Sequence, residues 1–136
     1  MPTLQFTNAQ MQRPVLADRP RLDKDLLEHL ADVKPELFRA YPLPYLQWVA
    51  HDTVDLAAPF DLQDVFALRV FLRLRFEVAP GFFRQPQIAA TLGDRTLAPM
   101  KRWERLSMPP FGDAWLEARQ FDGAGEWRAR YWGVAA

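Results

Sequence analysis

Residues 62–78, LQDVFALRVFLRLRFEV, form the most hydrophobic run in the chain, and the predicted fold depends on whether they make a helix or a strand. Asp61 is placed to cap a helix here, with Asp64 in its first turn. Over residues 72–78, however, apolar and charged residues alternate, which is typical of a half-buried strand. Both structures therefore have support from the sequence.

Three features favour the helix: the capping signal, the length of the run before Pro80-Gly81, and the ion-pair spacing from Arg73 to Glu77. A strand over residues 70–78 would need a partner, and the only other stretch with strand character is residues 127–134. Two strands alone are only marginally stable. We therefore predict a central apolar helix over about residues 62–78, with a minor β-hairpin as the alternative.

Prolines divide the rest of the chain into short helices. Apolar residues at helical spacing predict an amphipathic helix over residues 22–33. Prolines that suit a first helical turn predict helices over residues 35–40, 44–56, 86–92 and 100–106, and a last helix covers residues 112–121. The predicted fold is mainly α, a compact bundle of short helices around the central one.

The length of 136 residues suits one domain with one core. Residues 1–20 carry three prolines and little periodicity, and are predicted to form an extended arm. Residues 21–136 then form a single helical domain, which ends in an aromatic segment over about residues 111–136.

Composition excludes several function classes. Seventeen basic and seventeen acidic residues give a net charge of zero, which argues against nucleic acid as a partner and leaves homo-oligomer formation open. The absence of cysteine excludes disulfides, thiolate metal sites and a cysteine nucleophile. With no signal-like start and no apolar run of membrane-spanning length, we expect a cytoplasmic protein without membrane contact.

Motifs for catalysis are weak. Ser107 is the only serine and lacks the glycines of a nucleophile elbow, and the six glycines form no phosphate-binding loop, so we expect no enzyme and no cofactor. The alternative is a metal-dependent phosphohydrolase of the HD type, in which His29, His51 and Asp52 would bind the metal. The ordinary interpretation places His29 on the polar side of its helix and pairs His51 with Asp55 at the surface.

Three arginines interrupt the central apolar run, at positions 69, 73 and 75. A guanidinium near a core must be paired or must reach water. We expect internal ion pairs with Asp61, Asp64, Glu77 or an acid of another helix, and the alternative is contact with an anionic partner.

The last third of the chain is rich in tryptophan, tyrosine and arginine, the residue types that dominate binding energy at protein interfaces. The same interleaving occurs in single-strand nucleic-acid binders, a second alternative that the neutral charge disfavours. The other interpretation is that these tryptophans close the core, Trp103 and Trp115 above all. We predict a protein-contact surface made by Trp115, Arg119, Trp127, Arg130, Tyr131 and Trp132.

Residues 26–106 carry a series of short motifs: LEHL at 27–30, FDLQDV at 60–65, APGFF at 79–83, PQI at 86–88, LAP at 97–99 and RWERL at 102–106. In this order they resemble small helical accessory proteins of bacterial type VI secretion gene clusters. The resemblance implies an all-helical fold and a role in binding a secretion component or its cargo, without catalysis, and carries over no functional residue. The resulting hypothesis is a non-enzymatic adaptor, chaperone or immunity-type protein whose partner is a secretion component, effector or toxin.

Overall fold

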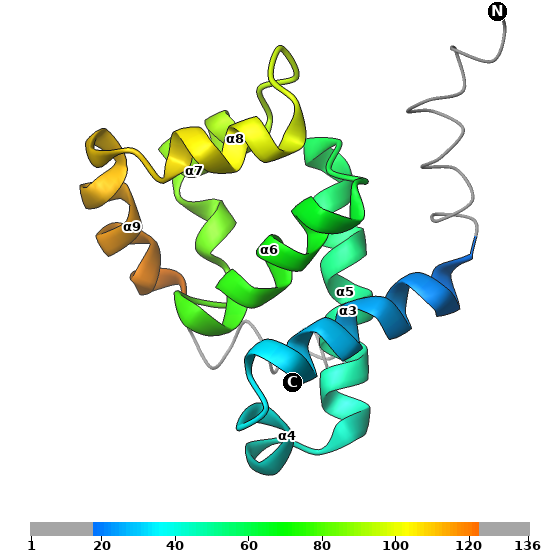
Figure 1. Cartoon of the computed structure of the whole chain (residues 1–136). Coiled ribbons are helices and arrows are strands. Elements are labelled where there is room, and N and C mark those ends of the chain that lie inside the picture. The colour runs from blue at the N-terminus through cyan, green and yellow to red at the C-terminus, as the bar shows by residue number, and fades with distance from the viewer. Residues whose placement is uncertain (1–17, 123–136) are drawn as a thin grey trace, which may run out of the picture.

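The computed structural model describes residues 18–122, which fold into a bundle of short helices (Figure 1). The α-helices are α3 (Arg19–Val33), α4 (Leu37–Ala40), α5 (Leu43–Ala57), α6 (Val65–Glu77), α7 (Pro86–Leu92), α8 (Pro99–Leu106) and α9 (Gly112–Ala118). Short 3-10 turns link them: η1 (Ala58–Phe60), η2 (Phe82–Arg84), η3 (Pro109–Phe111) and η4 (Arg119–Asp122). The predicted mainly α fold is confirmed.

Residues 70–77 are helical, and no strand occurs among the described residues, so the strand alternative for this segment is wrong. The alternation over residues 72–78 arises because α6 makes apolar contacts on several sides. Leu72 is fully buried in the core, Phe76 packs against Tyr41 with ring centroids 6.1 Å apart, and Leu74 faces α8 and α9. The predicted partner strand, residues 127–134, lies outside the described residues.

The N-terminus of α6 differs from the prediction by three residues. Asp64, not Asp61, is the cap, and its carboxylate accepts a hydrogen bond from the Ala67 N–H at 3.1 Å. Asp61 instead ends η1 in a left-handed conformation, with φ 59°, which aspartate tolerates better than most residues.

The helix α3 begins at Arg19, inside the segment predicted to be an extended arm. Asp18 caps it by accepting a hydrogen bond from the Arg21 N–H at 3.2 Å, and Pro20 fits the first turn, where no N–H is needed. Residues 18–20 therefore belong to the helical domain. The rest of the predicted arm, residues 1–17, lies outside the described residues.

The helices α3, α5 and α6 pack against one another and form the first half of the core. Leu26, Leu30, Val49, Leu68 and Leu72 have no exposed surface there. Fully burying such a side chain stabilises the fold by roughly 1.5–3 kcal/mol. None of the described helices is both long and apolar enough to cross a membrane.

The second half of the core is aromatic and joins α6 to the C-terminal helices. The ring of Phe71, on α6, lies 5.1 Å from Phe82, 5.2 Å from Phe83 and 6.2 Å from Trp103, measured between centroids. Because α6 contributes to both halves, its predicted central position is confirmed.

The last predicted helix, residues 112–121, ends as an α-helix at Ala118, and the chain tightens into η4 with a non-helical Phe121. The Phe121 carbonyl accepts a hydrogen bond from the Gly81 N–H at 3.0 Å. A Cβ at Gly81 would lie 3.1 Å from that same oxygen, so this close approach favours glycine.

Candidate functional site

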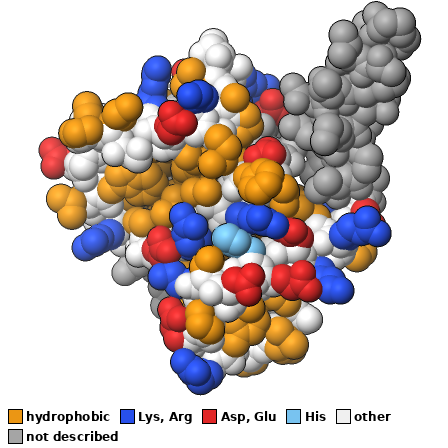
Figure 2. Space-filling model, viewed as in Figure 1, with side chains coloured by type: hydrophobic (Ala, Val, Ile, Leu, Met, Phe, Trp, Pro, Cys, Tyr) orange, Lys and Arg blue, Asp and Glu red, His pale blue; other side chains and the backbone are white. Residues whose placement is uncertain are grey.

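A groove of about 590 Å³ opens between α6, α8 and α9, and we call it the α6–α8–α9 groove. Figure 2 shows hydrophobic side chains gathered between these three helices on the visible face of the molecule. The groove is lined by Val70, Arg73, Leu74, Val78, Met100, Trp103, Glu104, Leu106, Ser107, Gly112, Trp115, Leu116 and Arg119.

Each wall is one face of a helix. The α6 wall follows Val70, Leu74 and Val78, which are spaced four residues apart, while Leu68, Phe71 and Leu72 of the same helix turn into the core. All three wall residues are only partly buried. One side of α6 thus packs only in part against the core and stays partly open along the groove.

The α8 wall is held in place by Arg102, which is buried and does not belong to a surface patch. Its guanidinium donates hydrogen bonds to the carbonyl oxygens of Leu97, Phe60 and Leu92 at 2.8–2.9 Å. These bonds tie α8 to η1 and to the end of α7. They leave Met100 and Glu104 facing outward along the groove, above the buried Trp103.

The α9 wall is set by Trp115. Its ring stacks on Phe82 at a centroid distance of 5.8 Å, and its indole N–H donates to the Leu106 carbonyl at 2.7 Å. The indole is half-buried, so Trp115 both closes the core and lines the groove. Leu116, the next residue, is 61% exposed, which is a large exposure for leucine.

Charged side chains mark the rim. Arg73 pairs with Glu77 at 3.3 Å, and Lys34 of α3 lies at the same distance from that carboxylate. Glu104 is within 3.4 Å of Lys101. Arg119 makes no ion pair with any described residue, so it leaves one uncompensated positive charge at the end of α9.

Two of the six residues predicted to contact a partner, Trp115 and Arg119, line the same groove. The other four, Trp127, Arg130, Tyr131 and Trp132, lie outside the described residues. The sequence did not indicate the groove itself, because its lining includes Val70, Leu74 and Met100, whose apolar side chains read as ordinary core positions.

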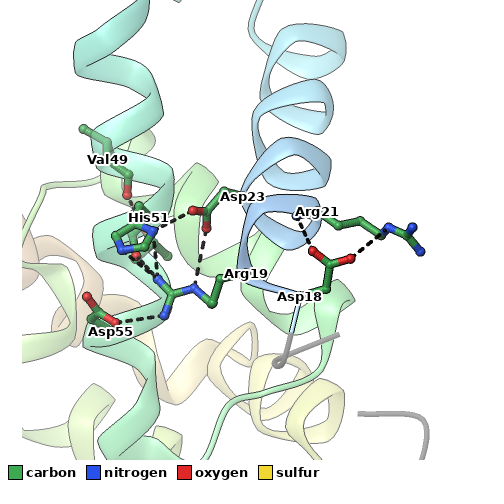
Figure 3. A network of polar contacts seen from close by, with 8 residues as sticks. Asp18, Arg19, Arg21, Asp23, Val49, His51 and Asp55 are labelled. Atoms are coloured by element: carbon green, nitrogen blue, oxygen red, sulfur yellow. Dashed lines mark hydrogen bonds and ion pairs between the residues drawn. The ribbon is translucent and has the colours of Figure 1, made fainter. Parts of the chain in front are cut away.

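The histidines of the phosphohydrolase hypothesis have different surroundings. His51 does not pair with Asp55 as predicted. Its Nδ1 contacts Asp23 at 2.5 Å, and Arg19 Nη2 lies 3.1 and 3.2 Å from the two ring nitrogens and donates to the His51 carbonyl (Figure 3). Arg19 also pairs with Asp55, so this surface network joins α3 to α5.

Asp52 follows His51 in the chain but is buried, and its carboxylate accepts a hydrogen bond from Arg75 at 3.2 Å. His29 is half-buried, not fully on the polar side of α3, and its Nε2 has no hydrogen-bond partner among the described residues. Burial lowers the pKa of His29, and the charges of Arg69 and Arg73 lower it further. Within residues 18–122, no three histidine or carboxylate side chains gather as a metal site requires.

The three arginines of α6 form internal ion pairs, which confirms that part of the prediction. Arg69 makes a bidentate pair with Asp25 of α3 at 2.8 and 2.9 Å, and the hydrogen bonds to that carboxylate raise the pKa of Arg69. Arg73 pairs with Glu77, while the fully buried Arg75 pairs with Asp52. Neither Asp61 nor Asp64 is a partner of these arginines.

Comparison with known proteins found no family model that matches the chain, and no significant match to a curated protein or to a solved structure.

Proposed function

We propose that this chain is a non-enzymatic interaction protein that binds a second protein through the α6–α8–α9 groove. The occupant is a segment of the partner that carries bulky apolar side chains and an acidic group. The observation that carries the proposal is an apolar groove of about 590 Å³ with the largely exposed Leu116 on its edge and two tryptophans in its walls.

Energetics support a protein partner. Leu116 and Met100, respectively 61% and 43% exposed, flank the groove and leave apolar surface in water. Burying each against a partner would contribute roughly 1.5–3 kcal/mol at most. Trp115 and Arg119 are of the types that dominate binding energy when a partner encloses them.

The polar groups of the groove fit the binding of a protein segment better than catalysis on a small substrate. The Trp115 indole N–H and the Ser107 hydroxyl already donate to backbone carbonyls of α8, at 2.7 and 2.6 Å. A pocket for a small polar substrate would present several convergent polar groups to it. Taken with the resemblance to type VI secretion accessory proteins, the partner we propose is a secretion component, an effector or a toxin.

Site-specific photo-crosslinking tests the proposal. A photoreactive amino acid is placed at Leu116 in the full chain, which is expressed in the cells where the chain is native. The matched control carries the same amino acid at Phe66, which is 57% exposed on α6 but does not line the groove. We expect one crosslinked protein from position 116 that position 66 does not give, joined through a segment that contains apolar and acidic residues.

The purified partner should then bind the purified chain. The Leu116→Glu variant should lose this binding while its unfolding free energy stays within about 0.5 kcal/mol of wild type, because the side chain is mostly exposed. Phe66→Glu should bind as wild type does. If the same proteins crosslink from both positions, or if Leu116→Glu binds the partner unchanged, the groove is not the binding site.

A further inference from the structure

We infer that the groove binds its partner as a single amphipathic α-helix of about two to three turns, with an acidic residue placed against Arg119. This inference rests on the proposed function and specifies the structure of the bound segment. It comes from the helical faces that line the groove, the state of their backbone groups and the charge at the rim.

The lining residues follow one rule on all three walls. On α8 they are Met100, Trp103, Glu104 and the buried Leu106, followed by Ser107 at its end, and on α9 they are Gly112, Trp115 and Leu116, followed by Arg119 at its end. Apart from Leu106, both sets have the spacing i, i+3, i+4 and i+7, which is one face of a helix. The α6 wall uses positions 70, 73, 74 and 78, nearly the same spacing. Three helices thus turn one face each toward a space that a fourth helix would fill.

The carbonyls at the end of α8, which border the groove, are already satisfied. At the end of α8 the carbonyls of Trp103 and Glu104 accept the Ser107 N–H, the Arg105 carbonyl accepts the Met108 N–H, and the Leu106 carbonyl accepts the Trp115 indole. An extended segment in the groove would lose water from its own N–H and C=O groups without finding partners, which is costly. A helix satisfies its backbone internally and presents only side chains.

The size and charge of the groove define the bound helix further. The α6 wall runs from Val70 to Val78, which are eight helical steps and about 12 Å apart at the helical rise. A bound helix therefore inserts apolar residues at i, i+4 and i+7. Arg73 and Glu104 already face opposite charges at the rim, whereas Arg119 faces none among the described residues, so a carboxylate of the partner fits there.

Two display libraries test this inference against the full-length chain. One presents random residues on the exposed face of a small helical scaffold, and the other presents linear segments bounded by prolines. We call a binder groove-dependent if its affinity falls by about 100-fold or more with Leu116→Glu, because binding would then bury an unpaired charge. We expect them to come from the helical library, with apolar residues at i, i+4 and i+7 and one Asp or Glu.

The charge of Arg119 gives a second readout that a change in folding would not mimic. Selection against Arg119→Glu should replace the preferred acid by Lys or Arg at the same position, and the wild-type binders should lose about threefold to tenfold in affinity, as expected for an exposed pair. An unchanged acid preference would overturn the assignment of Arg119. Groove-dependent binders from the proline library alone, or none from either library, would overturn the bound helix.

Other occupants give distinct results. Binding that appears only after residues 123–136 are deleted would assign the groove to that segment of the chain. A concentration-dependent dimer that Leu116→Glu abolishes would assign it to a second copy. Either result contradicts the inference. If position 116 crosslinks a partner through an extended or basic segment, the proposed function stands and the inference fails. If no partner crosslinks there, the proposed function fails.

Discussion

Replacing Asp52 should destabilise the fold strongly, because its carboxylate compensates a guanidinium with no exposed surface. Arg75 donates to Asp52 at 3.2 Å, to the Thr53 hydroxyl at 3.1 Å and to the Pro80 carbonyl at 3.0 Å, and its side chain is 0% exposed. In Asp52→Ala, two of these three acceptors of the Arg75 guanidinium remain, the Thr53 hydroxyl and the Pro80 carbonyl, and both are neutral. Removing one partner of a buried pair typically costs about 3–5 kcal/mol.

Two further variants make the magnitude specific. Asp52→Asn keeps an acceptor of similar size but removes the charge, and since a charge-assisted hydrogen bond is roughly twice as strong as a neutral one, we expect a loss of about 2 kcal/mol. Arg75→Met leaves the carboxylate buried and should cost about 3–5 kcal/mol. The double variant Asp52→Ala/Arg75→Met leaves neither charge of the pair buried. Its loss of unfolding free energy should therefore be about 3 kcal/mol, well below the sum of the two single losses.

Equilibrium unfolding in urea, followed by tryptophan fluorescence and far-UV circular dichroism, measures these free energies on the full chain. A domain of this size is stable by only about 5–15 kcal/mol, so every variant should shift the midpoint clearly. If Asp52→Ala stays within about 1 kcal/mol of wild type, or if the double variant loses the sum of the two single losses, the Asp52 carboxylate does not stabilise the fold by compensating the charge of Arg75. A surface metal ligand would instead tolerate this substitution in metal-free buffer.

Three other predictions concern single positions. Arg102→Met leaves the carbonyls of residues 60, 92 and 97 without their donor and should cost about 3 kcal/mol or more by urea unfolding, and Arg102→Lys should recover only part of it because an ammonium lacks the planar fork. Asp64→Ala should lower the unfolding free energy by about 1 kcal/mol, because α6 loses its N-terminal cap. Asp61→Gly should not destabilise the fold, because the backbone of Asp61 is left-handed and glycine adopts that conformation readily. If Asp61→Gly is instead the more destabilising of the two, Asp61 and not Asp64 caps α6. The pKa of His29 is lowered from 6.5 in the folded protein, so as the pH falls the imidazole is protonated in the unfolded chain before it is protonated in the folded one. The contribution of neutral His29 to the unfolding free energy is therefore complete above pH 6.5. It is lost as the pH falls from there to the pKa of the folded state. The unfolding free energy of wild type should therefore fall relative to that of His29→Gln as the pH falls below 6.5, and parallel curves would contradict the shift.

The helices could be predicted from the sequence because local physics decides them. Prolines sit in the first turns of α5, α7 and α8, where their missing N–H costs nothing, and the leucines of α3 repeat every four residues. The boundaries were harder where two local signals compete. Asp61 and Asp64 both suit a helix cap, and only the turn of η1 decides that Asp61 ends one element while Asp64 starts the next.

Partners across the fold could not be predicted. The sequence indicated that Arg69 and Arg75 need acids, but Asp25 lies 44 residues from Arg69 and Asp52 lies 23 residues from Arg75. Nine other aspartates and six glutamates compete for those roles in the sequence. Likewise, nothing in the sequence around Arg102 indicated that its guanidinium would donate to three backbone carbonyls.

The groove shows why residue type alone identifies part of a binding surface. Tryptophan and arginine indicated Trp115 and Arg119, because such side chains contribute large contact areas and directional charge. Leu74 and Val78 carry no such signal, since a leucine on α6 can equally face the core or an empty space. The distinction arises only from how α8 and α9 are placed, and Arg102 and the stacking of Trp115 on Phe82 determine that placement. Arg102 and Phe82 shape the groove without lining it, so variants that loosen them should weaken partner binding although neither side chain would touch the partner.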